Sequence, residues 1–425
     1  MKVWLFQTGE PIHTDEGNYR PMRAINLSNA LIERGHQVVL WTSSFFHTEK
    51  KHRSKKFKTI VVNENLTIKL IPSFGYKKNI GLGRIIDHIH LSFNMYSRIN
   101  KETSFPDVAF VGYPPIETSY RLVKWLNKKR IPSIIDVKDL WPEMFLDKIP
   151  SPLKPLAKTL LFPFYLIGRN AIKNATGVTS MADGFLKWTL DFSRRGSINS
   201  QYNAVFPLTS EIGEISDGDM SAAKNWCEEQ GISIEKNIFR ICFIGSFMSV
   251  FDFQPIKDCA IKAQNEKLPL QFILCGDGHY IDEIKLMMKN LDNVIFPGWV
   301  DKSKIKIISK RSHVSIAPYI NINNFKNNLP NKIVDALSLG LPILSPLEGE
   351  VKKLISDYNV GLTYDLSESN NLYTCINQLI SNKDLLKLLS ENTSIVYREK
   401  FNFKKVYTQF VSHLEKTSKF NFENE

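Results

Sequence analysis

A lysine and an aspartate near the start of one expected helix are the first residues in this chain whose types and spacing could do chemistry. Pro330 and Asn331 suit the start of a helix, and Gly340 suits the left-handed position that follows one. Lys332 and Asp335 would share a face of that helix, with the lysine in the first turn, at the positive end of the helix dipole. A lysine is unfavourable there for the helix itself, so its position favours a bound anion.

Glycine-containing turns follow three of the expected strands. In parallel sheets, ligands bind beyond the carboxyl ends of the strands, where backbone N–H groups of glycine turns and helix starts can hold an anion. Two of the turns supply the candidate anion-binding residues Gly245, Ser246, Gly276, Asp277 and Gly278. The third lies at Gly9, and the next expected helix begins with Gly17, Asn18, Tyr19 and Arg20. Glycine is also common in turns for steric reasons alone, so the prediction of a site rests on the recurrence of these turns.

Two acidic residues follow a further expected strand, at residues 133–136. Asp139 and Glu143 lie where a general acid or base could reach a ligand, and with Lys332 they are the candidate catalytic residues. The alternative is that these carboxylates cap turns or lie in solvent.

Several kinds of site have no counterpart in the sequence. The nine histidines show no HExxH or other metal-ligand spacing, no DxD pair occurs, and no GxSxG motif indicates a hydrolase. We therefore expect no metal or other cofactor. The five cysteines are odd in number and form no CxxC motif, which favours buried free thiols in a reducing compartment.

Alternation of apolar strands and amphipathic helices runs through both halves of the chain and predicts an α/β protein. The expected strands of the first half lie at residues 2–8, 37–42, 107–111, 133–136 and 177–180, with helices at 17–34 and 84–99. The alternation restarts at residue 239, after a polar stretch. Near-continuous apolar strands indicate parallel sheets covered on both faces. We expect a first domain at 1–206, a linker at 207–237, a second domain at 238–400, and a C-terminal helix at 401–425 that crosses back to the first domain.

The basic charge of the chain is confined to its first half. Residues 1–206 contain 30 Lys and Arg against 16 Asp and Glu, whereas residues 207–425 contain 25 against 27. This asymmetry favours an anionic substrate or an anionic surface met by the first half. The partner would be a membrane or nucleic acid, although no nucleic-acid-binding motif accompanies the charge. The alternative is an ordinary solvated basic surface. The stretches 84–99 and 151–173 mix basic and apolar residues and could lie on a bilayer or be ordinary core faces. No signal peptide is recognisable, and no apolar stretch reaches the roughly 20 residues that span a bilayer.

A series of segments, in order along nearly the whole chain, resembles a known enzyme family. The segments are GNYRPMRAINLSNALIERGHQVVLWTS, PDVAFVGYPP, IDVKDLWPE, FRICFIGSF, FILCGDGHY, NVIFPGWVD, VSIAPY and LPNKIVDALSLGLPIL with GEV after it. They resemble the bacterial glycosyltransferases of family 4, and within it the branch that builds surface polysaccharides, similar to N-acetyl-L-fucosamine transferases. The resemblance implies the GT-B architecture, with two tandem Rossmann-like domains facing a cleft. It also implies an acceptor on the basic first domain, a sugar nucleotide on the second, and transfer with retention.

The resemblance also assigns roles to residues. The family's donor helix carries two glutamates separated by seven residues, of which the second binds the nucleotide ribose, and the matching positions here hold Asn327 and Asp335. Asp335 keeps a carboxylate, whereas Asn327 is polar without charge. Gly349 and Glu350, in the segment GEV, complete the implied donor-binding residues together with Asn331.

The chain departs from the family after the first strand of the second domain. Many relatives have an arginine and a lysine there to hold the diphosphate, but this chain has GSFMSVFDF and no cation. We expect Lys332 to take over that role.

The resemblance thus implies a retaining glycosyltransferase for O-antigen or capsule biosynthesis. It would move an N-acetylated amino or deoxy sugar from a nucleotide sugar, expected to be UDP-linked, to a polyprenyl-diphosphate-linked acceptor. It would act at the inner face of the cytoplasmic membrane, with no nucleic-acid partner. Two alternatives remain open: a UDP-sugar epimerase of the same architecture, and a non-catalytic nucleotide-binding subunit.

Overall fold

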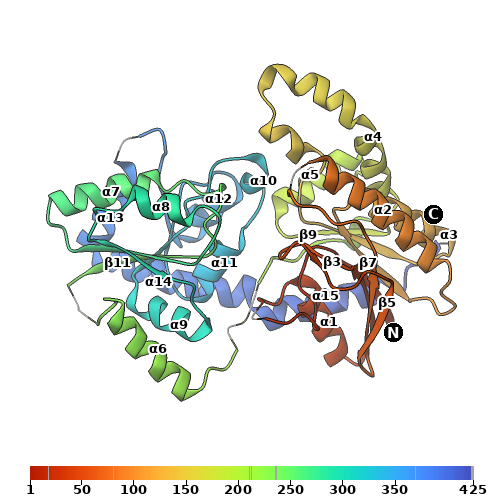
Figure 1. Ribbon diagram of the computed structural model, residues 1–425, viewed down its shortest axis with the longest axis horizontal. Coiled ribbons are helices and arrows are strands. Elements are labelled where there is room, and N and C mark those ends of the chain that lie inside the picture. Colours follow the sequence, from red (N-terminus) through yellow and green to blue (C-terminus); the bar gives the residue numbers. More distant parts are fainter. Residues whose placement is uncertain are drawn as a thin grey trace. The chain divides into compact units, whose positions relative to one another are not determined.

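The chain forms two compact units, shown in a computed structural model that describes residues 1–17, 19–79, 81–209, 211, 213–234, 237–368 and 370–422 (Figure 1). Unit 1 consists of Met1–Pro207 and Lys404–Glu425, and unit 2 of Leu208–Phe403. Each unit has its own parallel sheet with helices on both faces, which confirms the predicted α/β class.

The boundary between the units differs from the expected one. The stretch 207–237, expected to be a linker, belongs to unit 2 from Leu208 onward. Its helix α6 (Asp217–Glu229) packs against α9 (Lys302–Arg311) and buries Ala223 and Cys227. The polar composition that suggested a linker reflects the other, exposed side of this helix.

The sheet of unit 1 has eight strands. Their spatial order is β10 (Asn203–Val205), β9 (Gly177–Ser180), β8 (Ser133–Val137), β7 (Val108–Tyr113), β1 (Lys2–Phe6), β2 (Gln37–Ser43), β6 (Leu66–Ile71) and β5 (Lys58–Asn63). All neighbours are parallel except β5 and β6, because only Glu64 and Asn65 separate these two strands and a connection so short allows only a hairpin. A separate hairpin joins β3 (Phe45–Phe46) and β4 (Lys51–His52).

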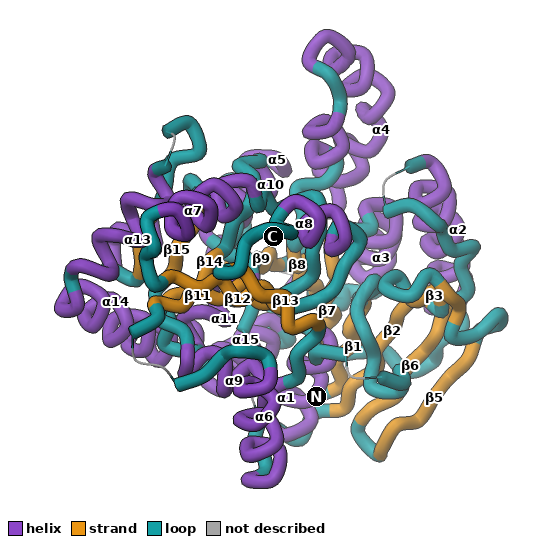
Figure 2. The backbone as a smooth tube through the Cα atoms, turned by 60° about the vertical axis from the view of Figure 1, so that its left-hand side comes forward, coloured by secondary structure: helices purple, strands orange, loops and turns teal. Residues whose placement is uncertain are grey.

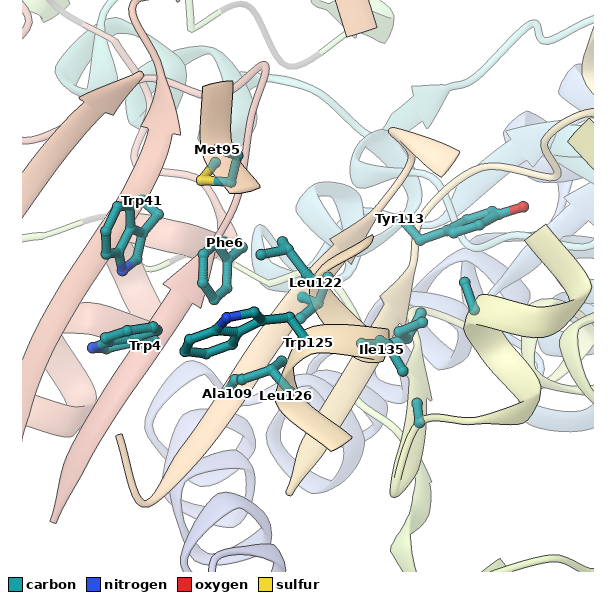
Figure 3. Close-up of a cluster of buried hydrophobic side chains, with 14 of the residues drawn as sticks. Trp4, Phe6, Trp41, Met95, Ala109, Tyr113, Leu122, Trp125, Leu126 and Ile135 are labelled. Carbon is teal, nitrogen blue, oxygen red and sulfur yellow. The ribbon is translucent and has the colours of Figure 1, made fainter. Parts of the chain in front are cut away.

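One face of this sheet supports a layer of helices. The layer consists of α2 (Leu82–Ile99), α3 (Ile116–Lys128), α4 (Lys154–Lys173) and α5 (Asp183–Ser193), with the short 3-10 turns Glu143–Lys148 and Ser151–Leu153 before α4. Aromatic side chains fill the space beneath it, as the stacked rings of Trp4 and Trp125, 5.9 Å between centroids, illustrate (Figure 3). No helix in the described ranges is both long and apolar enough to cross a membrane.

The opposite face is covered by the first and the last helix of the chain. These are α1 (Arg23–Glu33) and α15 (Phe403–Thr417), which lie on the same side of the sheet (Figure 1). Phe410 of α15 stacks on Phe206 at 4.1 Å and meets Phe110 of β7 edge-on at 5.6 Å. The C-terminal helix therefore supplies part of the core of unit 1.

Helix α1 begins at Arg23, six residues later than expected. Pro21 disfavours a helical conformation at the residue before it, and Gly17 and residues 19–22 form a loop. In that loop Gly17 has φ +118°, and the ring of Tyr19 lies against its Cα.

Unit 2 has a six-stranded, wholly parallel sheet. Its spatial order is β13 (Val294–Gly298), β12 (Leu270–Cys275), β11 (Phe239–Ile244), β14 (Val314–Ile316), β15 (Ile343–Ser345) and β16 (Gly361–Thr363) (Figure 2). The chain winds outward from β11 through β12 to β13, then returns to β14 on the other side of β11. This reversal creates a switch point between β11 and β14, where ligands bind in such sheets.

The helices of unit 2 pack on both faces of its sheet. Besides α6 and α9 they are α7 (Gln254–Asn265), α8 (Ile281–Met287), α10 (Asn323–Lys326), α11 (Asn331–Ser338), α12 (Glu350–Tyr358), α13 (Asn371–Ser381) and α14 (Lys383–Val396), followed by a π-helical turn at Tyr397–Phe401. The expected helix after Pro330 is α11, and Gly340 takes φ +70° after its end, as predicted.

Glu117, in the first turn of α3, is an acid in an apolar setting. Its side chain is 9% exposed, and its Oε2 accepts no hydrogen bond from the described residues. Burial raises the pKa of this carboxyl from 4.5 to about 7.

Replacing Glu117 by Gln should stabilise the protein in a pH-dependent way. The folded state disfavours the charged form of Glu117, so ionisation of this carboxyl lowers the stability of the protein. This loss of stability is absent below pH 4.5, grows as the pH rises towards 7, and is complete above pH 7. Glu117→Gln should therefore raise the melting temperature at pH 8 but not at pH 4.5, by relieving at most about 3 kcal/mol. Glu33→Gln, at an exposed site on α1, is the control. Equal effects of Glu117→Gln at both pH values would contradict the prediction.

Candidate functional site

Two glycine turns meet beyond the carboxyl ends of β11 and β12, beside the switch point of unit 2. The strand pairing continues into them, because the N–H of Gly245 donates to the carbonyl of Cys275 at 3.0 Å and the N–H of Phe247 to that of Asp277 at 2.9 Å. Asp277 also accepts the N–H of Gly278 on its side chain, at 2.7 Å. The structure thus brings together all five anion-binding candidates of the two turns, and Ser246 and Asp277 are exposed at the surface.

The backbones of the two turns approach so closely that only glycine fits. Gly245, Gly276 and Gly278 have φ of +152°, +132° and +154°, which L side chains rarely adopt. A Cβ on Gly276 would lie 1.9 Å from the carbonyl oxygen of Gly245, and one on Gly278 would lie 2.5 Å from the backbone N of Phe247. We call this pair of turns, Gly245–Phe247 and Gly276–Gly278, the glycine cradle.

The ammonium group of Lys332 lies against the cradle. Its Nζ donates to the carbonyl of Ile244 at 2.5 Å, and a Cβ on Gly245 would lie only 1.4 Å from it. The same Nζ lies 4.3 Å from the ring centroid of Phe243 and 5.3 Å from that of Phe251. A lysine that is unfavourable for its own helix is therefore held by a carbonyl dipole and two aromatic faces.

These phenylalanines are the part of the site that sequence reasoning missed. Phe243 and Phe251 belong to the segment FRICFIGSFMSVFDF, whose part after the strand, GSFMSVFDF, lacks the expected cations. An apolar run of this kind is typical of a core. Its proximity to Lys332, almost 90 residues later in the chain, depends on the order of strands across the switch point.

Two helices begin beside β14 and β15 without side-chain caps. Pro330 precedes α11 and Gly349 precedes α12, and neither residue makes a side-chain cap hydrogen bond to its helix. Gly349 has φ +71°, and a Cβ on it would lie 2.1 Å from the carbonyl of Lys326, so α10 presses against the start of α12. Glu350 is in the first turn of α12, where a carboxylate is favoured by the helix dipole. Uncapped helix starts are suited to anion binding.

The remaining donor-side candidates lie on α11 and directly after α10. Asp335 is half-buried on α11 next to Tyr319, whose pKa is raised above its usual value first by burial and then by the Asp335 carboxylate. Asn327 uses its amide to donate to the carbonyl of Asn323 at 2.9 Å. Asn331, half-buried, is the first residue of α11 and stands next to Lys332.

The candidates of the first half lie in unit 1. Glu143 accepts the indole N–H of Trp188 at 2.8 Å, and Asp139 lies half-buried in the turn after β8. Of the four residues predicted at the first helix, Gly17, Tyr19 and Arg20 lie in the loop before α1, and Asn18 lies outside the described residues. The three predicted catalytic residues are therefore divided, with Asp139 and Glu143 in unit 1 and Lys332 in unit 2.

Buried ion pairs hold the turns of unit 1 together. Arg23 of α1 pairs with Asp136 at the end of β8 at 2.8 Å, and both side chains are almost fully buried. Glu10, after β1, pairs with Lys138 after β8 and also accepts the N–H of Ala24 at 2.8 Å. Among the described residues, no group of His, Cys, Asp and Glu is arranged to hold a metal ion.

Part of unit 2 is similar to a known protein family. Residues 239–382 match the family model described as Glycosyl transferases group 1, and the match includes the cradle, Lys332 and Asp335. We call residues 239–382 the group 1 domain after this match. An uncharacterized glycosyltransferase of Methanocaldococcus jannaschii is 28% identical over 187 residues, which is 43% of this chain and 46% of that protein. The chain thus aligns with less than half the length of that relative.

Solved structures confirm the GT-B fold of the chain. HepE of Anabaena, solved in complex with UDP-glucose, matches with a TM-score of 0.64 and 15% identity over 98% of this chain and all of HepE. WaaG, a glycosyltransferase involved in lipopolysaccharide biosynthesis, matches with a TM-score of 0.62 and 11% identity over 97% of this chain and 99% of WaaG. At identities this low, the likeness shows that the group 1 domain and unit 1 share the fold of these structures. It does not show which ligands this chain binds.

Alanine at Gly276 should destabilise the group 1 domain through a backbone collision. The substitution combines an unfavourable positive φ with a Cβ 1.9 Å from the Gly245 carbonyl oxygen, so it should cost about 3 kcal/mol or more. Gly231→Ala is the matched control, because Gly231 has φ +73° in the same unit but nothing within 4 Å of a Cβ, and should cost only about 1 kcal/mol. Thermal melting followed by circular dichroism compares the two. Equal losses of stability in the two variants would contradict the predicted collision between the Gly276 Cβ and the Gly245 carbonyl.

Proposed function

We propose that this chain is a retaining glycosyltransferase that moves a sugar from a nucleotide sugar to a lipid-linked acceptor. The contact of the Lys332 ammonium with the glycine cradle carries the proposal. It offers a fixed positive charge beside exposed backbone turns at a switch point, which is where a diphosphate would bind.

The diphosphate would leave as the new glycosidic bond forms. The acceptor hydroxyl oxygen bonds to the anomeric carbon on the face from which the leaving oxygen departs, so the configuration is retained. The proton of that hydroxyl passes to the departing phosphate, and the nucleoside diphosphate is released. Negative charge grows on the leaving oxygen, and Lys332 and the uncapped starts of α11 and α12 stabilise it without having to reorient.

The nucleotide is proposed to be UDP. HepE, which has the same fold, was solved with UDP and with UDP-glucose. Asp335 would accept hydrogen bonds from the vicinal ribose hydroxyls, and Gly349 and Glu350 would lie on the donor side with Asn327 and Asn331. Asn327 already donates to a backbone carbonyl, which leaves its amide oxygen for a sugar hydroxyl.

The acceptor is proposed to be a polyprenyl-diphosphate-linked saccharide bound by unit 1. The net positive charge of this unit supports an anionic acceptor, and Asp139, Glu143 and the loop with Gly17, Tyr19 and Arg20 would orient its hydroxyl. The donor sugar is proposed to be N-acetylated amino or deoxy, as in N-acetyl-L-fucosamine transfer. The product would serve O-antigen or capsule synthesis at the inner face of the cytoplasmic membrane.

Mass spectrometry of reaction products tests the proposal. The full chain is incubated with a panel of UDP- and GDP-sugars and a polyprenyl-diphosphate-linked saccharide, and the expected product is the acceptor extended by one sugar. Conversion of free UDP-GlcNAc to an epimer in the absence of lipid would show that the chain is an epimerase and contradict the proposed transferase. Calorimetric binding of UDP without turnover on any acceptor would indicate a non-catalytic nucleotide-binding subunit.

Lys332→Met should lower turnover more than it lowers stability. The methionine keeps the apolar stem against Phe243 but removes the charge, so binding of the diphosphate should weaken by about 1.5–3 kcal/mol. The melting temperature should stay within a few degrees of the wild type, because the lysine is poorly placed for α11 itself. Lys353→Met, an exposed lysine on α12, is the control. Unchanged turnover in Lys332→Met would contradict the proposal that Lys332 stabilises the diphosphate.

Asp335→Ala should weaken binding of the sugar nucleotide. Loss of one charge-assisted hydrogen bond to the ribose costs about 1.5–3 kcal/mol, measurable by calorimetric titration with UDP. Asp357→Ala, an exposed aspartate on α12, serves as the control. Identical affinities of Asp335→Ala and the wild type would place Asp335 outside the site.

A further inference from the structure

One side of helix α2 carries an exposed apolar stripe. Leu82, Ile86, Ile89, Phe93 and Tyr96 are between 39% and 77% exposed, and they alternate at four and three residues, which aligns them along one side of the helix. An exposed stripe of this length on a soluble unit indicates a surface that binds a partner.

Helix α4 adds a second apolar surface. Figures 1 and 2 show the first half of α4 extending away from the sheet of unit 1. Leu156 and Leu160 in this half are 62% and 70% exposed, Leu153 in the 3-10 turn just before it is 55% exposed, and Lys154 and Lys158 flank these leucines. Apolar residues flanked by lysines are typical of helices that lie in a membrane interface.

A groove with a volume of about 480 Å³ opens between α2 and α3. Its apolar lining comprises Ile89, Phe93 and Tyr96 from α2, Tyr120 and Trp125 from α3, and Ile167 from α4. A concave site of this size with an aromatic and aliphatic lining suits an apolar chain.

Cations surround this groove. Arg121, Lys124 and Lys128 line it from one side of α3, and the guanidinium of Arg121 lies 4.0 Å from the centroid of the Phe93 ring. Unit 1 as a whole contains 34 Lys and Arg against 19 Asp and Glu. An anionic head group would therefore be attracted to the same place that accepts an apolar chain.

The one acid among the described lining residues is Glu117. It is 91% buried, given its exposed fraction of 9%, and its Oε2 lacks a hydrogen-bond partner in the described part of the chain. Burial raises its pKa to about 7, so a large share of this carboxyl is uncharged at neutral pH. The groove thus presents an apolar lining and a carboxyl that is partly uncharged at neutral pH, with positive charge at its edge.

We propose that the outer face of α2, α3 and α4 docks on an anionic lipid bilayer. The stripe of α2 and the leucines of α4 enter the boundary between head groups and acyl chains. The groove takes the chain of one lipid, and Arg121, Lys124 and Lys128 hold its phosphate. A bilayer with anionic lipid offers both an apolar interior and a negative surface, whereas nucleic acid offers no apolar surface to match the stripe.

Sedimentation with vesicles tests the docking. The full chain, without any sugar donor, is mixed with vesicles of phosphatidylcholine alone or of phosphatidylcholine with phosphatidylglycerol, and binding is expected to the second kind. The double variant Lys124→Gln/Lys128→Gln should bind these anionic vesicles at least about tenfold more weakly. Lys224→Gln/Lys383→Gln removes the same charge from exposed sites of unit 2 and should bind like the wild type.

A second pair of variants tests the apolar contribution. Ile89→Asp/Tyr96→Asp changes the exposed stripe beside the groove and should abolish binding at a salt concentration at which the wild type still binds. Leu286→Asp/Leu388→Asp makes the same change at exposed positions of unit 2, 73% and 49% exposed, and should not. Circular dichroism spectra identical to that of the wild type establish that the variants are folded.

Three results would overturn the docking. The first is equal binding to both kinds of vesicle. The second is a dimer of the wild type in sedimentation velocity that is absent in the Ile89→Asp/Tyr96→Asp variant. The third is binding of the wild type to RNA and not to vesicles, with the RNA binding lost in the Lys124→Gln/Lys128→Gln variant. The docking does not depend on the transfer reaction. A chain that binds anionic vesicles but transfers no sugar would keep the docking and remove the proposed function.

Discussion

The contact between the backbones of Gly245 and Gly276 is the constraint on which the candidate site depends. The two turns approach so closely that no side chain can stand between them, and the space this leaves beside Gly245 is where the Lys332 ammonium lies. The order of strands in unit 2 brings α11 across the switch point to this place. Strand order, glycine positions and a single lysine therefore act together. A change in any one of them alters where positive charge is offered to a ligand.

Two aromatic residues help to fix the Lys332 ammonium beside the glycine cradle. The ring faces of Phe243 and Phe251 carry no formal charge, but they attract the charge that α11 brings to them. Because the ammonium also donates a hydrogen bond to the Ile244 carbonyl, it is positioned before any ligand arrives, which lowers the cost of ordering it on binding. Unit 2 thus has a preorganised cation beside two glycine turns.

Much of this architecture could be predicted from the sequence, and the failures have physical causes. The strands β1, β2, β9 and β11 and the helix α11 could be found because buried parallel strands are continuous apolar runs and helix starts carry local signals. The start of α1 was misjudged because Pro21 outweighs the apolar periodicity around it. The helix α6 looked like a linker because only its Ala223 and Cys227 side is buried. The glycines and Lys332 could each be predicted as candidates from the sequence. The contact between Lys332 and the glycine turns could not be predicted, because the turns are more than fifty residues away from α11 in the chain.

The participation of α15 in the core of unit 1 has a consequence for the order of folding. During synthesis the sheet of unit 1 is complete when Val205 of β10 has emerged, but the side that receives Phe410 stays open until the last helix is made. Unit 2, at Leu208–Phe403, is synthesised entirely within that interval. Domains that form during synthesis usually fold from the N-terminus onward. In this protein the unit that is made first is the one that is finished last.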